Sequence, residues 1–249
     1  MLSRIEDAGL NASAPPQQRW LDGWLVRFSP GKAKRARCIN AVATGRLPTA
    51  AKLRLCEMLY HDAGLPLVVR ITPFSLPSGL DGDLAAMGLN PHDDTMVMAC
   101  SAFPTMRPAA LPAGTEWVPL GPADFADAVG SLRGSSAEQR SAHRQRLSLS
   151  PVPYRGYAIR RLDDGELLAC GQTAIEAELV GLYDVFTRES TRGQGLATLL
   201  CQRLLALAAA SGARVGYLQV DADNLAARRI YERLGFVEGY RYHYRHAAA

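Results

Sequence analysis

The segment from Gly181 to Ala210 reads GLYDVFTRESTRGQGLATLLCQRLLALAAA, and it joins a strand pattern, a glycine loop and a helix pattern. Branched, aromatic and aliphatic residues from Leu179 to Thr187 predict a strand that ends in a polar turn. Leucine then recurs at helical spacing from Leu196 until Gly212 ends the pattern. The stretch therefore predicts a strand, a short glycine loop and a long amphipathic helix.

The glycine loop has the features of an anion-binding site. The first amides of a helix have no intrahelical partner, and they carry partial positive charge from the helix dipole. Gly193 and Gly195 lack a Cβ, so the backbone can turn tightly beside a phosphate, and Arg192 adds a full positive charge. A loop that only caps the helix is the alternative interpretation.

Two common phosphate-binding loops do not fit this segment. A Walker loop requires Gly-Lys followed by Ser or Thr, and the loop lacks that sequence. A dinucleotide-binding loop would need a third glycine where Thr198 stands. It also opens a doubly wound domain, for which the roughly fifty residues that follow are too few.

Arg192, Gly195 and Ala197 match the pattern R-x-x-G-x-A, and here the chain resembles the GNAT superfamily of acyl-CoA-dependent N-acetyltransferases. In that family the loop holds the pyrophosphate of acetyl-CoA. A second stretch resembles the family pattern N-x-x-A-x-x-x-Y-x-x-x-G-F, with matches at Asn224, Ala227, Tyr231, Gly235 and Phe236. Two signatures in this order favour a GNAT acetyltransferase over a simple helix cap.

The second signature is expected on a short helix that ends at Gly235. We expect that helix to bury Ala226, Ile230 and Leu234 and to present Tyr231 on a separate face. A phenol has a pKa of about 10, so it keeps its proton at neutral pH and can protonate a leaving thiolate. Tyr231 is therefore the candidate general acid, and a tyrosine that only packs at an interface is the alternative.

The resemblance to GNAT proteins also implies a set of cofactor contacts. Acetyl-CoA is expected to lie along the strand and the loop, in contact with Val185, Phe186, Thr187, Arg192, Gly193, Gln194, Gly195, Leu196, Ala197, Asn224 and Arg228. The base that takes a proton from the acceptor is open, with Glu178 and Asp184 as candidates. The segment from Leu132 to Ser150 is expected to wall the acceptor site, where its arginines attract an acidic acceptor or form a solvated helix face.

The composition limits the other classes of function. The chain has 249 residues, of which 48% are apolar, so it is long enough for one large domain or two small ones. Its five cysteines are scattered without ligand spacing, so we expect neither disulfides nor a bound metal. A net charge of +4 and the lack of a long apolar run predict a cytoplasmic protein that binds neither nucleic acid nor membrane.

The first half repeats the order of elements expected in the second half. Its predicted elements are strands at Trp20 to Ser29 and Arg37 to Thr44, a helix at Thr49 to Ala63, a strand at Leu67 to Thr72, a helix at Leu80 to Met87 and a strand at Thr95 to Ala102. The helix-ending Gly64 and Gly212 are 148 residues apart. The first copy has GRLPT at Gly45 to Thr49 in place of the cofactor loop, and Leu84 in the place of Tyr231. A coincidental match of strand and helix order is the alternative.

These observations predict an α/β (α+β) protein of two tandem GNAT-like domains, each with a mixed, mostly antiparallel twisted sheet flanked by helices. Residues 1–104 are the degenerate N-terminal domain, residues 105–112 a linker rich in proline and alanine, and residues 113–249 the catalytic domain. The catalytic domain is expected to have strands at Glu116 to Leu120, Tyr157 to Leu162 and Glu166 to Glu176, and helices at Ala123 to Leu132 and Ala137 to Leu147. The N-terminal domain is expected to serve as a lid, a substrate wall or the surface of a homodimer.

The activity implied by the resemblance is direct transfer of an acetyl group from acetyl-CoA to a primary amine of an unidentified acceptor, in a ternary complex. Two other classes stay open at this stage. One is a non-catalytic sensor that binds acyl-CoA, and the other is an interaction protein in which both halves are degenerate. The acceptor itself is not specified, because a fold does not choose a substrate.

Overall fold

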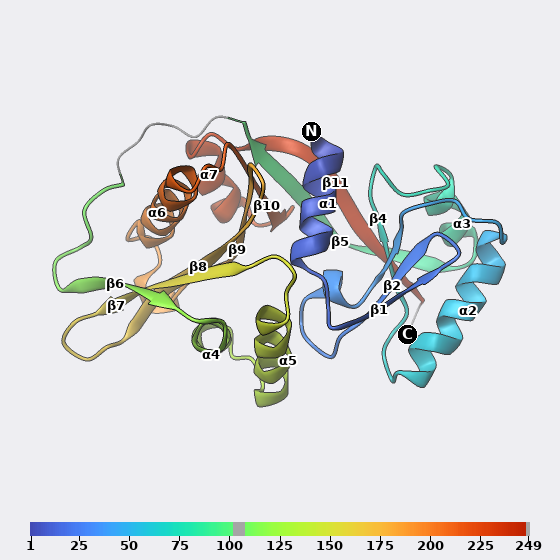
Figure 1. Ribbon diagram of the computed structural model, residues 1–249, viewed down its shortest axis with the longest axis horizontal. Helices are drawn as coiled ribbons and strands as arrows, with labels where there is room; N and C mark the ends of the chain where they lie inside the picture. The colour runs from blue at the N-terminus through green and yellow to red at the C-terminus, as the bar shows by residue number, and fades with distance from the viewer. Residues whose placement is uncertain (102–107, 248–249) are drawn as a thin grey trace.

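The computed structural model describes residues 1–101 and 108–247, and it places eleven strands in one twisted sheet (Figure 1). The helices are α1 (Leu2–Ala12), α2 (Thr49–Asp62), α3 (Leu80–Ala86), α4 (Pro122–Leu132), α5 (Ala137–Ser148), α6 (Leu196–Ala210) and α7 (Leu225–Arg233). The strands are β1 (Gln17–Leu21), β2 (Trp24–Phe28), β3 (Ile39–Ala41), β4 (Val68–Ile71), β5 (Leu89–Cys100), β6 (Thr115–Leu120), β7 (Tyr154–Arg161), β8 (Leu167–Glu176), β9 (Leu179–Thr187), β10 (Val215–Asp221) and β11 (Val237–Ala247). Two 3-10 helices, η1 (Lys34–Ala36) and η2 (Glu189–Thr191), complete the elements.

The strand order is β1-β2-β3-β4-β11-β5-β10-β9-β8-β7-β6. Among the described strands, the pairs β3/β4 and β9/β10 are parallel and the other eight pairs are antiparallel. A parallel pair needs a long crossover connection, and α2 and α6 supply the two that are required here. The predicted mixed, mostly antiparallel sheet of an α/β fold is confirmed.

Strands from both halves of the sequence alternate at the centre of the sheet. β5, from the first half, pairs with β10 on one side and with β11 on the other. β11, the last strand of the described chain, pairs in turn with β4 and β5. The two halves therefore form one continuous sheet, in which each half receives a strand from the other (Figure 1).

The two halves also repeat one topology. The order β3-α2-β4-α3-β5 in the first half matches β9-α6-β10-α7-β11 in the second. Gly64 and Gly212 follow α2 and α6, and both adopt the left-handed backbone, with φ of 64° and 93°. The repeat agrees with the tandem arrangement, while domain boundaries at residues 104 and 113 stay a prediction.

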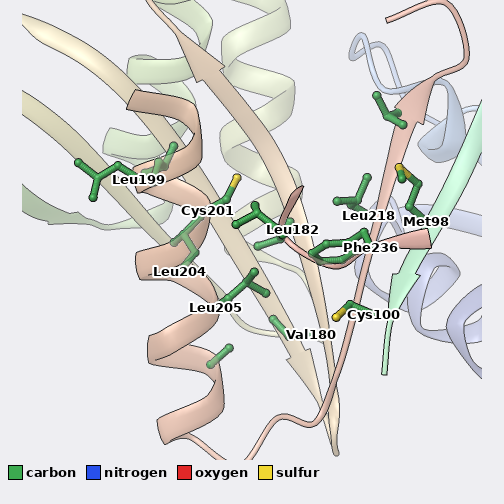
Figure 2. Packing of buried hydrophobic residues seen from close by; sticks show 14 of the residues in the cluster. Met98, Cys100, Val180, Leu182, Leu199, Cys201, Leu204, Leu205, Leu218 and Phe236 are labelled. Atoms are coloured by element: carbon green, nitrogen blue, oxygen red, sulfur yellow. The ribbon is translucent and has the colours of Figure 1, made fainter. Parts of the chain in front are cut away.

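Side chains alternate along the strands, so the core has two faces. On one face α6 packs Leu204 and its neighbours on Leu182 of β9 and Leu218 of β10, and Figure 2 shows these side chains pointing toward one another. On the opposite face Ile5 of α1 packs near the centre of the sheet and Phe125 of α4 packs on β7 and β8. Both faces of the second half are thus covered by helices.

Most of the predicted elements are confirmed, but their ends differ. β5 begins six residues before the predicted Thr95, and β3 covers only Ile39–Ala41 of the predicted Arg37 to Thr44. Ala102, the predicted end of the β5 strand, lies outside the described residues. The single strand predicted from Trp20 to Ser29 is wrong, because Asp22 and Gly23 form a two-residue turn with φ of 42° and 86° and divide it into β1 and β2. α1 and β11 have no counterpart in the sequence predictions. Residues 105–107 of the predicted linker lie outside the described residues, and residues 108–112 contain neither helix nor strand.

Within residues 1–101 and 108–247, no helix is both long enough and apolar enough to cross a membrane.

A buried ion pair fastens α1 to the sheet. Arg70 of β4 donates to both carboxylate oxygens of Glu6, with Nη2 3.0 Å from Oε2, and the hydroxyl of Tyr240 on β11 donates to Oε2 at 2.5 Å. The guanidinium of Arg70 also lies over the ring of Tyr242, 3.9 Å from its centroid. Burial opposes ionisation of Glu6, but Arg70 and Tyr240 hold the pKa of this carboxyl below its usual value.

Replacing Glu6 with Gln should lower the free energy of unfolding by about 3–5 kcal/mol at pH 7, because Arg70 would keep a buried charge without a partner. The folded-state pKa of Glu6 is below its unfolded value. The ion pair therefore contributes its full stability at pH values above the unfolded-state pKa of Glu6. This contribution is lost as the pH falls through the folded-state pKa. Urea unfolding at pH 7 and at acidic pH measures the difference.

The matched control is Glu238→Gln, which removes an exposed ion pair with Arg241 and should leave the stability nearly unchanged. Equal losses in the two variants at pH 7 would contradict the importance of the buried pair.

Candidate active site

The loop before α6 leaves the first turn of that helix open. Gly195 is the N-cap residue with a left-handed backbone, φ 80°, and Gly193 has φ 78°. No side chain of the described residues caps α6, and its first turn holds no acidic residue. A Cβ at either glycine would meet no atom within 4 Å, so glycine is required here for its backbone conformation. The amides at this helix start suit an anion.

β9 leads into this loop, and its last residues separate from β10. The two strands pair from Leu179 to Leu182, although β9 continues to Thr187 and β10 to Asp221. Beyond Leu182, the β10 side of β9 therefore has no partner strand among the described residues. The sheet opens between these two strands on the side where the glycine loop begins.

A bulge in β9 lies at the start of this opening. Asp184 and Val185 of β9 together oppose the single residue Gly171 of β8. Asp184 has a positive φ of 51°, which is rare for a residue with a side chain. Because a bulge bends its strand and changes the direction of a side chain, it accounts for the position of Asp184 at the wall of a cavity.

Asp184 lies among polar and cationic side chains. Arg133 Nη1 donates to Asp184 Oδ1 at 2.7 Å, and Gln172 Nε2 donates to Oδ2 at 2.7 Å. His143 Nε2 is 3.4 Å from the same Oδ2. Burial opposes ionisation of Asp184, but Arg133 and His143 hold its pKa well below the usual range. Asp184 is therefore a carboxylate at neutral pH, and it is a weak base.

A cavity of about 210 Å³ lies beside Asp184. Its walls come from α4, α5 and the segment 29–35 that follows β2. A second cavity shares Arg35, Arg146 and Asp184 with the first, and it extends to Leu182 and Gln219, where β9 and β10 separate. The two cavities adjoin, so they connect the outer helices with the opening in the sheet.

The ring of Phe186 lies near one arginine of the glycine loop and one arginine of the cavity wall. The Arg192 guanidinium carbon lies 6.0 Å from the centroid of the Phe186 ring, and that of Arg133 lies 5.5 Å from it. Arg192 belongs to the loop, and Arg133 binds Asp184 at the cavity wall. The predicted cofactor loop and the predicted acceptor wall are thus neighbours.

Tyr231 lies on the packed face of α7, and the prediction of a separate face is wrong. Ala227, Ile230 and Tyr231 pack against the core beneath α6, whereas Ala226 is exposed. The reason is that α7 turns the stripe from Ala227 to Leu234, spaced by three and four residues, toward α6 and the sheet. Burial raises the pKa of Tyr231, so the phenol keeps its proton at neutral pH.

Two other residues predicted to contact the cofactor lie at the start of α7. Asn224 caps the helix, and its Oδ1 accepts from the amide of Ala227 at 3.1 Å. Arg228 Nη1 donates to the carbonyl of Ala222 at 3.0 Å, and its Nε is buried without a hydrogen-bond partner among the described residues. Both side chains thus stabilise this helix end.

The structure does not bring Glu178 to the site. Glu178 lies in the turn between β8 and β9, where Arg4 Nη2 is 2.6 Å from its Oε1. The glycine loop follows the other end of β9, nine residues away at roughly 3.3 Å per residue. Glu178 is therefore remote from both the loop and the cavity.

The loop of the first half that corresponds to the glycine loop is filled by a side chain of the same chain. The carboxylate of Asp22 accepts from the amide of Arg46 at 2.8 and 2.9 Å and from the amide of Leu47 at 2.7 Å. Lys52 Nζ lies 3.8 Å from the same carboxylate. An internal anion thus satisfies the amides before α2, which differs from the open start of α6.

The sequence patterns give no role to the segment 29–35, which supplies Arg35 to the cavity wall. No local signal marks that segment, because its place beside α5 depends on the packing of the two halves. The five cysteines are all buried, and among the described residues no group of three His, Cys, Asp or Glu side chains is arranged to hold a metal ion.

Comparisons with known proteins match the part of the chain that contains the glycine loop. Residues 128–236, which include the glycine loop and α7, match the Acetyltransferase (GNAT) family. The chain is similar to the "Uncharacterized N-acetyltransferase YobR" of Bacillus subtilis (strain 168), with 28% identity over 231 residues, 92% of this chain and 91% of that protein.

Solved structures share the fold. A "GCN5-related N-acetyltransferase" from Kribbella flavida superposes with a TM-score of 0.71 at 19% identity, over 99% of this chain and 95% of that one. A "Tandem GNAT protein from the clavulanic acid biosynthesis pathway" gives a TM-score of 0.63 at 19% identity, over 80% of this chain and 69% of that one. The part of the chain from residue 128 to residue 236 belongs to the GNAT family of acetyltransferases, and it lies within a tandem GNAT fold.

Proposed function

We propose that this protein transfers an acetyl group from acetyl-CoA to a primary amine of an acceptor that binds in the cavity beside Asp184. The amine nitrogen attacks the thioester carbonyl in a ternary complex, a C–N bond forms, and the C–S bond breaks to release the CoA thiolate. The observation that carries the proposal is the open start of α6 at Gly195, which is connected through Phe186 to that cavity.

The residues from Arg192 to Ala197 would bind the pyrophosphate of acetyl-CoA through the amides of α6. The pantetheine arm would extend along Val185 to Thr187, where β9 has no partner strand on its β10 side. An extended chain with amide groups can pair with such an edge as an added strand. In this position the amide of Val185 would polarise the thioester carbonyl.

Tyr231 is proposed as the acid that protonates the leaving thiolate. It extends from the face of α7 that packs toward α6, the helix whose start would hold the pyrophosphate. Its raised pKa keeps the hydroxyl protonated across the neutral range, so a donor is present whenever sulfur leaves.

We propose His143 as the base that accepts a proton from the acceptor amine, with Asp184 as its positioning residue. Asp184 alone is a weak base because its pKa is low, whereas a carboxylate beside an imidazole orients the ring and stabilises its charged form. His143 lines the same cavity, with its side chain 15% exposed. Glu178 has no part in this proposal because of its distance.

The first half is proposed to bind no acetyl-CoA of its own. Asp22 already occupies the amides before α2, and a phosphate there would meet a carboxylate. The first half would instead serve as a wall of the acceptor site through its segment 29–35.

Gly195→Glu should weaken acetyl-CoA binding by at least about 100-fold, because the new carboxylate would lie where the pyrophosphate binds. Calorimetric titration of the native protein should give one site per chain. The control is Gly212→Glu, because Gly212 also has a left-handed backbone and open space but lies at the other end of α6. Retained affinity in a folded Gly195→Glu protein, or two sites in the native one, would contradict the proposal.

Tyr231→Phe should lower kcat by about 100-fold and leave the Kd for acetyl-CoA nearly unchanged, because only the transferable proton is removed. Release of the CoA thiol under saturating acetyl-CoA measures kcat. Tyr157→Phe is the matched control, since Tyr157 stacks on Trp117 at a centroid distance of 4.9 Å outside the site. An unchanged kcat for Tyr231→Phe would leave that side chain with a packing role.

His143→Gln should also lower kcat by about 100-fold without changing the Kd for acetyl-CoA, because the proton acceptor is lost. If Asp184 acts through His143, the double variant with Asp184→Asn should be about as slow as the slower single variant. His61→Gln is the control, since the side chain of His61 is 90% exposed. Losses that multiply would show that the two residues act independently.

A further inference from the structure

The cavity beside Asp184 carries more positive than negative charge. The cationic side chains of its lining are Lys32, Lys34, Arg35, Arg133, Arg140 and Arg146, and its one carboxylate is Asp184. Two of the cations are paired, Arg133 with Asp184 and Lys34 with Asp93. The other four make no ion pair with any residue that the structure describes, so the cavity holds a surplus of positive charge.

Arg35 has an unused hydrogen-bond donor in this cavity. Its Nη1 donates to the hydroxyl of Tyr242 at 3.1 Å, but its Nε is buried and has no partner among the described residues. A buried donor without an acceptor is costly, so an acceptor that reached this guanidinium would satisfy a group that the described residues leave unpaired. Arg35 lines both of the adjoining cavities.

Arg146 is a second buried cation in the same place. It is 7% exposed, its Nη1 is 3.4 Å from the carbonyl oxygen of Ala12, and its guanidinium carbon is 5.8 Å from the ring centroid of Tyr154. Arg146 makes no ion pair among the described residues, and Asp184, the carboxylate whose pKa it helps to lower, is already paired with Arg133. Burying an unpaired charge is unfavourable, and an anion beside Arg35 and Arg146 would offset that cost.

The first half supplies part of this charged wall. The segment 29–35, which carries Lys32 and Arg35, follows β2 and lies beside α5 in Figure 1. The contact is close, because a Cβ at Gly31 would lie 3.7 Å from the Cβ of Ala142 on α5. The cationic residues of α5 and those of the first half thus meet across one space.

We infer that the acceptor is an amine that also carries an anionic group, a carboxylate or a phosphate, and that Arg35 and Arg146 bind this group. The inference rests on the proposed function and names the substrate class of the same site. Guanidinium groups donate paired hydrogen bonds to carboxylates and phosphates alike. The ammonium end of the acceptor goes toward Asp184, and the surplus cations repel amines that have no anionic group.

The first test compares matched acceptors in a thiol-release assay with acetyl-CoA. The pairs are β-alanine with β-alaninamide, and O-phosphoethanolamine with ethanolamine. At low ionic strength the anionic member of at least one pair should have a kcat/KM at least about tenfold higher, and added salt should reduce this preference. The pair that shows the larger preference distinguishes a carboxylate from a phosphate.

The second test uses two arginines of α5. Arg140 lines the cavity, whereas Arg144 lies one turn further along the helix and pairs with Asp127 at 2.8 Å. Arg140→Gln should raise the KM for the preferred anionic acceptor about tenfold and leave the KM for its neutral partner unchanged. Arg144→Gln should change neither. Arg140 is half-buried beside Gly130 of α4 and Arg144 is exposed, and both substitutions leave the buried Arg35 and Arg146 in place.

A third measurement does not depend on turnover. The same anionic acceptors, added without acetyl-CoA, should raise the Tm of the native protein more than that of Arg140→Gln. Thiol release at equal rates with anionic and neutral amines would overturn the inference and leave the proposed function standing. Anion-dependent stabilisation without thiol release from any amine would support an anionic ligand in this cavity and count against the proposed transfer.

Discussion

The antiparallel ladder between β5 and β11 is the constraint on which the rest of the structure depends. β5 is the last strand of the first half, and on its other side it pairs with β10 of the second half. β11 comes at the end of the second half, and on its other side it pairs with β4 of the first half. Since backbone groups of a central strand must be paired, this ladder joins the halves into one sheet. The segment 29–35 is consequently held beside α5, and the charged cavity exists only in the joined structure.

The two copies of the topology show what separates a scaffold from a binding site. Before α6, left-handed glycines hold the amides open, and no acidic residue lies in the first turn. Before α2, Asp22 supplies the anion from the turn between β1 and β2. In the first half, α1 also inserts Glu6 against Arg70, near the place where β3 and β4 stop pairing. In the first half, Asp22 thus lies at the start of the helix and Glu6 lies near the end of the parallel strand pair. The corresponding two places in the second half are open.

Local patterns were sufficient for most of the fold and for the loop. The glycine loop, its helix and the repeat follow from spacing along the sequence, because helix ends and strand lengths are local properties. The side of α7 that carries Tyr231 was predicted incorrectly, since a short helix with polar residues on several faces is oriented by its partner α6. The role of segment 29–35 and the remoteness of Glu178 depend on the pairing of distant strands, which periodicity does not report.

The exchange of strands also sets the order in which the protein can form. A ribosome releases β1 to β5 before β11 exists, so the first half waits with the ladder edges of β4 and β5 unpaired. Such edges are open to pairing with other chains until the partner strand arrives. Contacts between residues this far apart in sequence form slowly, because a long loop must close first. β11 thus completes both halves at once, and neither half has its full set of strand pairs before β11 has been made.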